Sequence, residues 1–586
     1  MRLLKIYSFL LILSLSLFAC EELLEPVNEN LSTIDRIYID PLFAEGLLME
    51  AYDKIPTSGL TFNEVATDDA VTNDNSDQYR RMATGEWSNL FNPVSQWANC
   101  NSAVLYLNNF LSIIDTVKWK WSDPEMNTMF VRRLKGEAHA LRGLFQYHLL
   151  VTVGGVGANG ELLGIPLYDQ FLEKDDNFNV PRAGFNESVD QILSDFDTSL
   201  EYLTMDDYLD ISDAGDLPPG LEGVDITKYN EVFGSRTMQR ISGRIVKGLK
   251  ARVALLAASP AFSEGDIVKW ERAANLAAVS INGIGGTTGL DPVGHRFFNA
   301  DLVKVANVHL NPQKEILWRT SKNPSDGREN NNYPPSLFGS GRINPSQNLV
   351  DAFPMANGYP ITDALSGYDP ANPYANRDPR LSLYVVYNGS VMRGKTIKTG
   401  VGGGVNAKDS IQTSTRTGYY LRKLLREDVN MDPAVRVFQD HYEVHIRYTE
   451  LFLIYAEAAN EAWGPDGTGL NSFSARDVIS AIRNRTGIAQ PDNYLVSVNT
   501  KDAMRTLIRN ERRLELCFEG FRFWDLRRWK ADLTEGVKGV NINKTSTTFN
   551  YVDVEARVYN NGFMHYGPLL EKEIVKFNAL VQNQGW

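Results

Sequence analysis

The sequence predicts a mainly α-helical protein in which helix pairs form a scaffold and a loop-rich face carries the function. Several segments place large apolar residues on one helical stripe and glycine or alanine on a second stripe. The second stripe lets another helix approach closely. Between residues 285 and 443 this periodicity disappears, and Gly, Pro, Asn and Asp become frequent. A long irregular segment inside a folded protein is usually functional.

The amphipathic pattern predicts about eight helices. It is clearest in residues 127–151, where Gly136 and Gly143 belong to the small-residue stripe, and it recurs in residues 239–258. The other predicted helices lie near residues 96–114, 187–204, 268–280, 448–462, 475–486 and 501–518. Alternating large and small stripes favour antiparallel pairs of the tetratricopeptide type, although no clean 34-residue period is present. In the irregular segment, residues 384–387 and 411–421 are expected to form short strands.

The N-terminal residues predict export and lipid attachment at Cys20. Positive charges at Arg2 and Lys5 precede an apolar run that is too short to cross a bilayer core of about 30 Å. This layout is typical of a secretory signal. The run ends at Ala19-Cys20, which resembles the lipobox of bacterial lipoproteins, in which the cysteine is acylated. An ordinary signal peptide with an incidental cysteine is the alternative.

These features divide the chain into four expected parts. They are a signal peptide (1–19), a lipid anchor and tether (20–40), an N-terminal helical region (41–284) and a C-terminal region (285–586) with a loop-rich insert (285–443) and closing helices. The mature chain would begin with acidic residues, including Glu21 and Glu22. An acidic start resembles the export tag of surface-exposed lipoproteins, although acidic tethers also occur simply because they stay solvated.

The composition argues against nucleic acid as a partner. The formal net charge is −13 at pH 7 and the sequence has no basic cluster, whereas binding to phosphates depends on clustered Lys and Arg. Besides Cys20, only Cys100 and Cys517 are present, so at most one disulfide could form. Cys517 lies among helical apolar residues, which favours a buried free thiol.

A charged stripe near the C-terminus predicts a buried ion-pair network. On a helix, Glu511 shares a stripe with Leu507 and Leu514, so its carboxylate needs a partner, because an unpaired buried charge costs several kcal/mol. Arg483 and Arg485 are available partners, together with the local arginines. The residues expected to take part are Glu511, Arg512, Glu515, Glu519, Arg522 and Asp525. A structural network is preferred here over a catalytic carboxylate.

The same region carries a family resemblance. The run Glu-Arg-Arg-Leu-Glu-Leu at 511–516, with Glu-Gly at 519–520 and Trp-Asp-Leu-Arg-Arg-Trp at 524–529, resembles the signature of SusD/RagB-type outer-membrane binding lipoproteins. Other parts of the chain also resemble blocks of this family, and they occur in the same order as in the family. These blocks are residues 135–143, 155–167, 250–256, 349–353, 448–461, 482–487 and 582–586. The resemblance extends over nearly the whole mature chain.

The resemblance implies a scaffold of tetratricopeptide pairs with a loop-rich ligand face. It also implies a cell-surface protein, anchored in the outer membrane through Cys20, that caps a TonB-dependent transporter of the SusC type. Such proteins capture oligosaccharides for import, and some relatives take peptides instead. The resemblance is to binders rather than enzymes. A lipoprotein glycosidase remains the rival, since it needs only two carboxylates about 5–9.5 Å apart and the chain has 72 acidic residues.

Two stretches have the composition that sugar capture requires, namely aromatic faces and polar groups for hydroxyls. They run from residue 73 to 101 and from residue 318 to 342. The candidate ligand-binding residues are Asp77, Tyr79, Trp87, Trp97, Asn101, Trp318, Arg319, Asn331, Tyr333 and Arg342. For any single aromatic, core packing is the alternative. Trp97 opens a predicted helix and favours the core, whereas Trp87 and Tyr333, in polar segments, favour ligand.

No cofactor or metal is predicted. His441 and His445 would share one face of a strand, but the sequence offers no third ligand. Residues 73–77 superficially resemble a calcium loop yet lack the glycine and the glutamate that such a loop requires. Bound calcium therefore has no support in the sequence. Glycines 402–404 are expected to form a flexible loop because no phosphate-binding pattern follows them.

Overall fold

The computed structural model describes residues 40–56, 62–263, 265–305 and 314–586. The predicted signal peptide, Cys20 and nearly all of the tether lie outside these residues. In the described part, no helix combines the length and apolarity needed to span a membrane.

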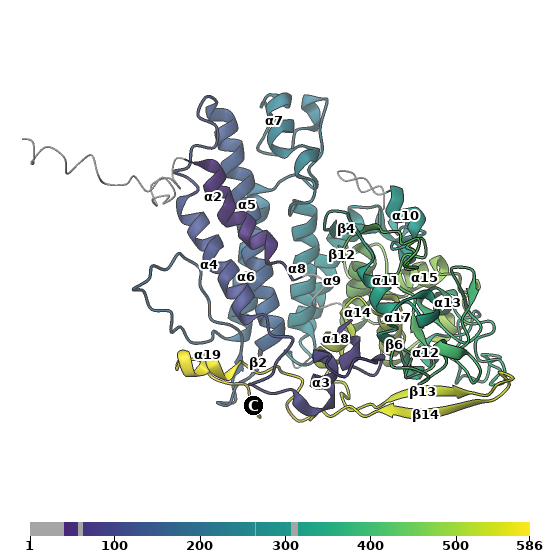
Figure 1. Cartoon of the computed structure of the whole chain (residues 1–586). Coiled ribbons are helices and arrows are strands. Elements are labelled where there is room, and N and C mark those ends of the chain that lie inside the picture. Colours follow the sequence, from purple (N-terminus) through teal and green to yellow (C-terminus); the bar gives the residue numbers. More distant parts are fainter. Residues whose placement is uncertain (1–39, 57–61, 264, 306–313) are drawn as a thin grey trace, which may run out of the picture.

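The helical scaffold is an array in which each long helix packs against the next (Figure 1). Its members are α2 (Pro41–Asp53), α4 (Trp97–Ile113), α5 (Pro124–Val153), α6 (Phe185–Tyr202), α8 (Gly243–Ala258), α9 (Ile267–Asn282), α14 (Tyr448–Trp463) and α17 (Lys501–Glu515). The mainly α class is therefore confirmed. The described residues form more helices than the eight expected. The additional helices are short, and a short helix has no long apolar stripe by which the sequence could predict it.

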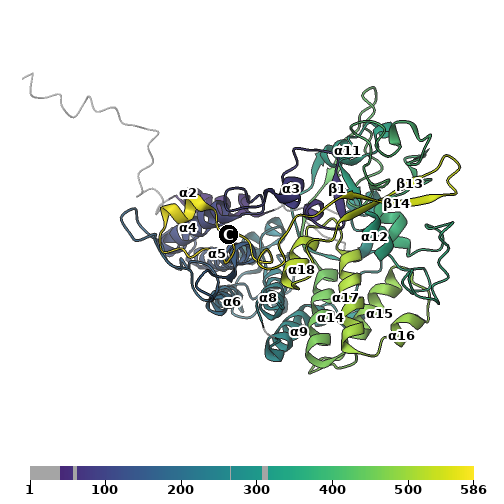
Figure 2. The same cartoon turned by 90° about the horizontal axis from the view of Figure 1, so that it is seen from below.

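The short helices connect or cover this array. They are α3 (Gln78–Arg81), α7 (Ile226–Phe233), α10 (Ala300–Val305), α11 (Gly327–Asn332), α12 (Gln347–Ala352), α13 (Pro379–Tyr384), α15 (Ala475–Arg485), α16 (Asn493–Ser497), α18 (Arg522–Arg528) and α19 (Glu571–Lys576). Seen from below in Figure 2, α4, α5 and α6 lie at one side of the molecule, and α12 lies at the other with the hairpin of β13 (Val537–Ile542) and β14 (Phe549–Glu555).

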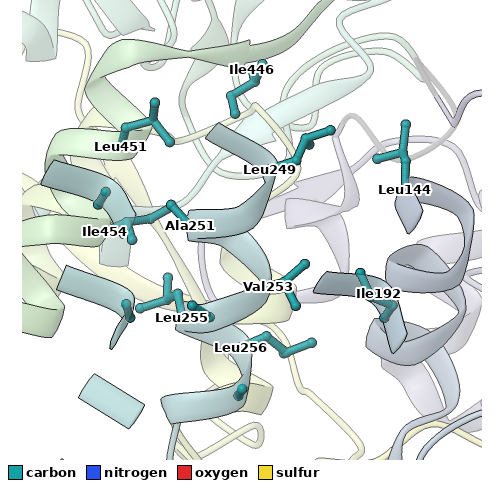
Figure 3. Close-up of a cluster of buried hydrophobic side chains, with 14 of the residues drawn as sticks. Leu144, Ile192, Leu249, Ala251, Val253, Leu255, Leu256, Ile446, Leu451 and Ile454 are labelled. Atoms are coloured by element: carbon teal, nitrogen blue, oxygen red, sulfur yellow. The ribbon is translucent and has the colours of Figure 1, made fainter. Parts of the chain in front are cut away.

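Helix α8 is the centre of the main core. Leu451 and Ile454 of α14 lie on one side of it, and Leu144 of α5 and Ile192 of α6 lie on the other (Figure 3). All four side chains are buried. Since α14 belongs to the C-terminal region, the array continues across the boundary at residue 284 and joins both halves of the chain in one core.

The predicted small-residue stripe of α5 allows α6 to approach closely. A Cβ atom added to Gly136 would lie 2.5 Å from Cγ of Leu203, and one added to Gly143 would lie 2.9 Å from Cε1 of Phe196. Both distances are too short for real carbon contacts. Glycine at these positions is therefore required by the helix–helix distance.

The strands of the described residues are short and form antiparallel pairs. Their pairing is β1 (Ala70–Thr72) with β6 (Ile343–Pro345), β2 (Gly155–Val156) with β3 (Leu162–Leu163), β4 (Ile316–Arg319) with β12 (Val444–Arg447), β5 (Asn323–Ser325) with β11 (Gln439–His441), β7 (Val385–Val386) with β10 (Tyr420–Leu421), β8 (Val391–Met392) with β9 (Lys395–Thr396), and β13 (Val537–Ile542) with β14 (Phe549–Glu555). The strand expected at 411–421 is wrong over most of its length. Only its last two residues are paired, because residues 411–419 form turns whose hydrogen bonds lie mostly within the segment, as from the Thr415 hydroxyl to the Tyr419 carbonyl at 2.6 Å.

Buried charges tie the loops to the array. Glu515 of α17 pairs with Arg485 of α15 at 2.7 Å, Arg380 of α13 at 3.2 Å and Arg447 of β12 at 3.3 Å. Burial alone would raise the pKa of Glu515, but these guanidiniums hold it well below its usual range. One carboxylate on the array thus fixes three separate segments of the loop-rich half.

Candidate ligand-binding site

The two stretches predicted to bind ligand meet at the β1–β6 pair. Ala70 pairs with Pro345 and Thr72 with Ile343. Just beyond β1, the side-chain amide of Asn73 donates to the carbonyls of Ser340 at 2.9 Å and Gly341 at 3.0 Å. Segments about 270 positions apart in the sequence thereby form one continuous surface.

On the β1 side, this surface continues into the short helix α3. Asp77 caps the helix by accepting a hydrogen bond from the Arg80 amide at 3.0 Å. Burial raises the pKa of the Asp77 carboxyl. Tyr79 is half-buried and packs against the core beneath. Arg80 bonds to Glu555 of β14 at 2.7 Å, and Arg416 bonds to the same carboxylate at 2.7 Å.

On the β6 side, residues 330–342 form a compact loop that presents Phe338. The amide of Ser340 donates to the Asn330 carbonyl, and that of Arg342 donates to the Asn331 carbonyl, both at 2.9 Å. Phe338 has φ +65° and is 50% exposed. A bulky residue in the left-handed region costs on the order of 1–3 kcal/mol, and such strain is concentrated at functional sites. The loop holds an aromatic ring outward at this cost.

A second loop borders Phe338. Ser336 and Asn406 join η9 (Pro335–Leu337) to η10 (Gly404–Asn406), with the Ser336 amide donating to Asn406 at 3.0 Å and the Asn406 amide donating to the Ser336 hydroxyl at 2.8 Å. Val405 is 43% exposed, and Ile411 is 45% exposed. The segment that contains glycines 402–404 was predicted to be a flexible loop, but these two hydrogen bonds hold its end against the neighbouring loop.

An ion pair lies on the same surface. Arg342 and Asp74 are 3.0 Å apart, and both side chains are reached by solvent. The Ser76 hydroxyl and amide donate to Asp74 at 2.7 and 2.9 Å, and these bonds hold the pKa of the Asp74 carboxyl below its usual value. The carboxylate is thus ionised at neutral pH and accepts hydrogen bonds.

We call this surface the loop face and define it as Asp74, Asn75, Asn331, Phe338 and Arg342. It combines an exposed aromatic ring, two exposed side-chain amides and a solvent-accessible ion pair. Such a set can stack against the apolar face of a sugar ring and bond to its hydroxyls. Of the predicted ligand residues, Asn331 and Arg342 belong to it, and Asp77 and Tyr79 lie beside it in α3.

The placement of Trp87 and Tyr333 in exposed polar loops is wrong. Trp87 is 3% exposed, and its ring lies 4.8 Å from that of Trp586 and 5.7 Å from that of Phe523. Tyr333 is fully buried, and its hydroxyl donates to the carbonyl of Arg426. Neither ring offers a face to a ligand, because partners distant in the sequence cover both.

The other predicted ligand residues lie away from the loop face. Trp97 begins α4 and is buried in the main core, as its helical position favoured. Asn101 is in the same helix and bonds to the Trp97 carbonyl at 3.0 Å. Trp318 and Arg319 are buried in β4, where the Trp318 indole donates to the Gln239 carbonyl at 3.0 Å. Trp318 and Arg319 were predicted to bind ligand because β4 lies shortly before the loop of residues 330–342 in the sequence.

Phe338 is the residue that sequence reasoning underweighted. The second stretch extended past it, but one aromatic among several gave no reason to choose it. The available signal was the pair of glycines at 339 and 341, which directly follow Phe338 and indicate a turn.

The six residues predicted for the ion-pair network all lie in ion pairs. Their partners are Arg380 and Arg483 for Glu511, Arg380, Arg447 and Arg485 for Glu515, Lys423 and Arg447 for Glu519, Asp68 for Arg522, and Asp525 for Arg512, with Asp525 also pairing with Arg528. None of the six belongs to the loop face.

The two histidines considered for metal binding have other partners. His441 lies 3.1 Å from Glu329 through Nε2, and the His445 ring lies against Trp318. Within the described residues, no group of three or more His, Cys, Asp or Glu side chains is arranged to hold a metal ion. Cys100 and Cys517 are both free and buried.

The fold and the loop face define the class of the protein as a helical binding scaffold with a ligand surface built from loops. Among solved structures, a SusD-like protein from Bacteroides fragilis is 24% identical with a TM-score of 0.71, over 94% of this chain and 99% of that one. A SusD-like carbohydrate binding protein from the same organism is 18% identical with a TM-score of 0.67, over 93% and 99%. A laminarin binding SusD-like protein is 19% identical with a TM-score of 0.55, over 93% and 99%. At these identities the likeness concerns the fold.

Sequence comparisons give the family. A model described as the SusD family matches residues 310–586, and one described as starch-binding associating with outer membrane matches residues 32–212. The chain belongs to the SusD/RagB family. A SusD-like protein from Formosa agariphila is 33% identical over 106 residues, which span 17% of this chain and 19% of that relative.

Proposed function

We propose that the protein binds oligosaccharides at the loop face and delivers them to a TonB-dependent transporter of the SusC type. The observation that carries the proposal is Phe338, a half-exposed ring held in a strained backbone conformation between side-chain amides and the Arg342–Asp74 ion pair. The descriptions of two relatives, one carbohydrate-binding and one laminarin-binding, support a glycan as the ligand.

The mechanism is passive capture. A sugar ring stacks on Phe338, and Asn75, Asn331 and the ion pair bond to its hydroxyls. Acylation of Cys20 holds the protein in the outer leaflet of the outer membrane, facing outward beside the transporter. Tethering raises the effective concentration of the bound sugar at the transporter, so a weak site suffices.

The protein acts without catalysis. Asp74 belongs to the loop face and Asp77 lies beside it, and their pKa values are shifted in opposite directions. Two carboxyls with opposite pKa shifts are the pattern expected of the catalytic pair of a glycosidase. However, Asp77 is occupied in capping α3, and Asp74 is paired with Arg342. Incubation with a glycan panel should release no new reducing ends. Release that disappears in Asp77→Asn would instead establish a hydrolase.

Calorimetry tests the ligand class. Oligosaccharides from a panel of β- and α-glucans should bind, and oligopeptides of similar length should not. The Phe338→Ala variant should weaken glycan binding about tenfold, since removing a stacking ring costs roughly 1–1.5 kcal/mol. Trp121→Ala is the matched control, because Trp121 is 72% exposed in the loop between α4 and α5. If peptides release heat of binding and glycans release none, the protein would instead be the peptide-binding lid of a transporter.

The anchor and the partner are tested in cells. Labelled palmitate should be incorporated into the wild type and not into Cys20→Ser, and protease added to intact cells should remove the wild-type protein. Gentle detergent should co-purify a large β-barrel protein with it. A protein that carries no acyl chain and purifies alone would contradict this part of the proposal.

A further inference from the structure

A partly open cavity of about 200 Å³ lies between the N-terminal and C-terminal parts of the helix array. Helices α5 and α8 form one wall, with Tyr147, His148 and Arg252, and the opposite wall includes β4, β12, α14, α17 and α18. No residue of the loop face lines it. Interfaces between structural units are frequent places for small-molecule sites, and this volume is below the roughly 300–1,000 Å³ of sites for drug-sized ligands. It suits one small ring.

Two guanidinium groups in the cavity wall have unused donors. Arg512 is 3% exposed and bonds to Asp525 through Nε at 2.7 Å, but its Nη1 has no acceptor among the described residues. Arg527 is also 3% exposed, and its Nη1 is likewise without an acceptor in the described part of the chain. Leaving a buried charged donor unsatisfied costs more than leaving a neutral one.

Arg527 has no ion-pair partner among the described carboxylates, although three aromatic rings surround it, including Trp524 at 5.1 Å. Rings attract a cation but accept no conventional hydrogen bond. Burial lowers the pKa of Arg527 to about 9. The group remains a cation at neutral pH in a site that the described residues do not neutralise.

The other charges in the wall are paired, which leaves the charge of Arg527 uncompensated. Its arginines are Arg252, Arg328, Arg447, Arg512, Arg527 and Arg528, and its carboxylates are Glu443, Glu450, Glu519 and Asp525. Arg252 is already paired with Glu450 at 2.5 Å. Burial lowers the pKa of His148 to about 3 and that of His445 to about 4, so neither imidazole adds charge. Arg328 is paired with Glu443, Arg447 with Glu519, Arg512 with Asp525 and Arg528 with Glu457. Among the described residues of the wall, Arg527 is thus the one guanidinium without a carboxylate partner, and an anion would offset its charge.

The neutral groups in the wall suit a hydroxylated ring. A neutral imidazole carries one donor and one acceptor, which His148 and His445 both provide, and Tyr147 adds a hydroxyl. The rings of Trp318 and Phe521 contribute apolar faces, and Trp318 lies 4.5 Å from the His445 ring. The wall therefore combines unsatisfied cationic donors, neutral hydrogen-bonding groups and aromatic surface.

We propose that this cavity is a second binding site, distinct from the loop face, for one molecule of a small hydroxylated carboxylate of the sugar-acid class. The carboxylate bonds to the free donor of Arg512, and the hydroxyls bond to His148 and His445. The site is independent of the proposed delivery of oligosaccharides, so either can be correct without the other.

Calorimetry of the full mature protein with D-glucuronate, D-glucose and acetate tests the proposal. Glucuronate should bind with a stoichiometry of one. Glucose, which lacks the charge, and acetate, which lacks the ring, should each bind at least tenfold more weakly. The fluorescence of Trp318 and Trp524, which both line the cavity, should change with the same midpoint.

Three variants locate the binding. His148→Phe removes a hydrogen-bonding group and adds volume, and Arg512→Gln removes the cation. Each should weaken glucuronate at least tenfold. Because Arg512 also pairs with Asp525, the His148 variant serves if Arg512→Gln fails to fold. Arg272→Gln is the matched control, since Arg272 is 51% exposed on the surface of α9, and it should bind like the wild type.

Phe338→Ala separates the two sites, because it should leave glucuronate affinity unchanged while weakening the oligosaccharide. Absence of glucuronate binding to the folded wild type at millimolar concentration would overturn the proposal. So would equal affinity for glucose, or glucuronate binding that Phe338→Ala abolishes and His148→Phe leaves intact.

Discussion

The helix array and the loop-rich half are stabilised by different interactions. In the array, α5 and α6 approach closely because glycine lies at the contact, and the core around α8 is apolar. In the loop-rich half, Glu515 pairs with Arg380, Arg447 and Arg485, which belong to three separate segments. The loop-rich half also has an apolar cluster of its own, which includes Tyr333, Leu349 and Tyr384. Buried ion pairs add fixed contacts between this cluster's loops and helix α17.

The largest expected effect comes from breaking the ion pairs. Glu515→Gln removes a carboxylate that three buried guanidiniums share. Arg380 and Arg447 keep closer carboxylate partners, but Arg485 keeps only Glu315 at 3.4 Å among the described residues, so the free energy of unfolding should fall by about 3–5 kcal/mol. Denaturant titration measures it. Glu50→Gln is the control, because Glu50 is 55% exposed and lies 3.9 Å from Lys54, and it should change stability by less than about 1 kcal/mol. Equal effects would contradict the contrast between the two halves.

The next effect depends on pH. Burial raises the pKa of Glu64 from 4.5 to about 7, and its Oε2 has no partner among the described residues. The folded state then binds the proton more tightly than the unfolded state, so this group lowers stability as pH rises from about 4.5 to about 7. The loss is on the order of 3 kcal/mol.

Glu64→Gln should remove that loss. Unfolding measured at about pH 4.5 and about pH 8 should show a smaller decline in the variant than in the wild type. Glu457 gives the opposite case, because its pairing with Arg528 at 2.6 Å holds the pKa at about 2 despite burial. Its contribution is lost only as pH falls below about 4.5. An unchanged pH profile in Glu64→Gln would contradict the assignment.

A smaller effect tests the helix array. Gly143→Ala places a carbon 2.9 Å from Cε1 of Phe196 and 3.2 Å from the Ile192 carbonyl, so stability should fall by about 1–3 kcal/mol. Gly46→Ala in α2 meets nothing within 4 Å and should stabilise by roughly 0.5–1 kcal/mol through helix propensity. Thermal unfolding of both variants gives the comparison. Equal changes would mean that glycine is not needed at the α5–α6 contact.

The helices were predictable because their signals are local. The stripe read at 127–151 corresponds to α5 (Pro124–Val153), and the one at 448–462 corresponds to α14 (Tyr448–Trp463). The predicted end of a helix is wrong where the helix stops before its apolar pattern does. Helix α17, for example, ends at Glu515 rather than at residue 518. The family resemblance predicted the same helical scaffold, because the blocks that carry it consist mostly of scaffold residues.

The site was less predictable because exposure in a loop is decided by distant contacts. Trp87 is covered by Trp586, which lies at the other end of the sequence. Tyr333 and Phe338 are five positions apart in one polar segment, yet one is buried and the other half-exposed. The sequence located the two stretches, and the pairing of β1 with β6 shows which of their residues share a surface.

The most direct test of the account is glycan calorimetry on Phe338→Ala together with its unfolding curve. Binding at the loop face predicts about tenfold weaker affinity with stability nearly unchanged, because the ring is half-exposed, alanine keeps a Cβ at the φ of +65°, and the buried ion pairs stay intact. Unchanged affinity in a folded variant would contradict the claim that the loop face binds the ligand.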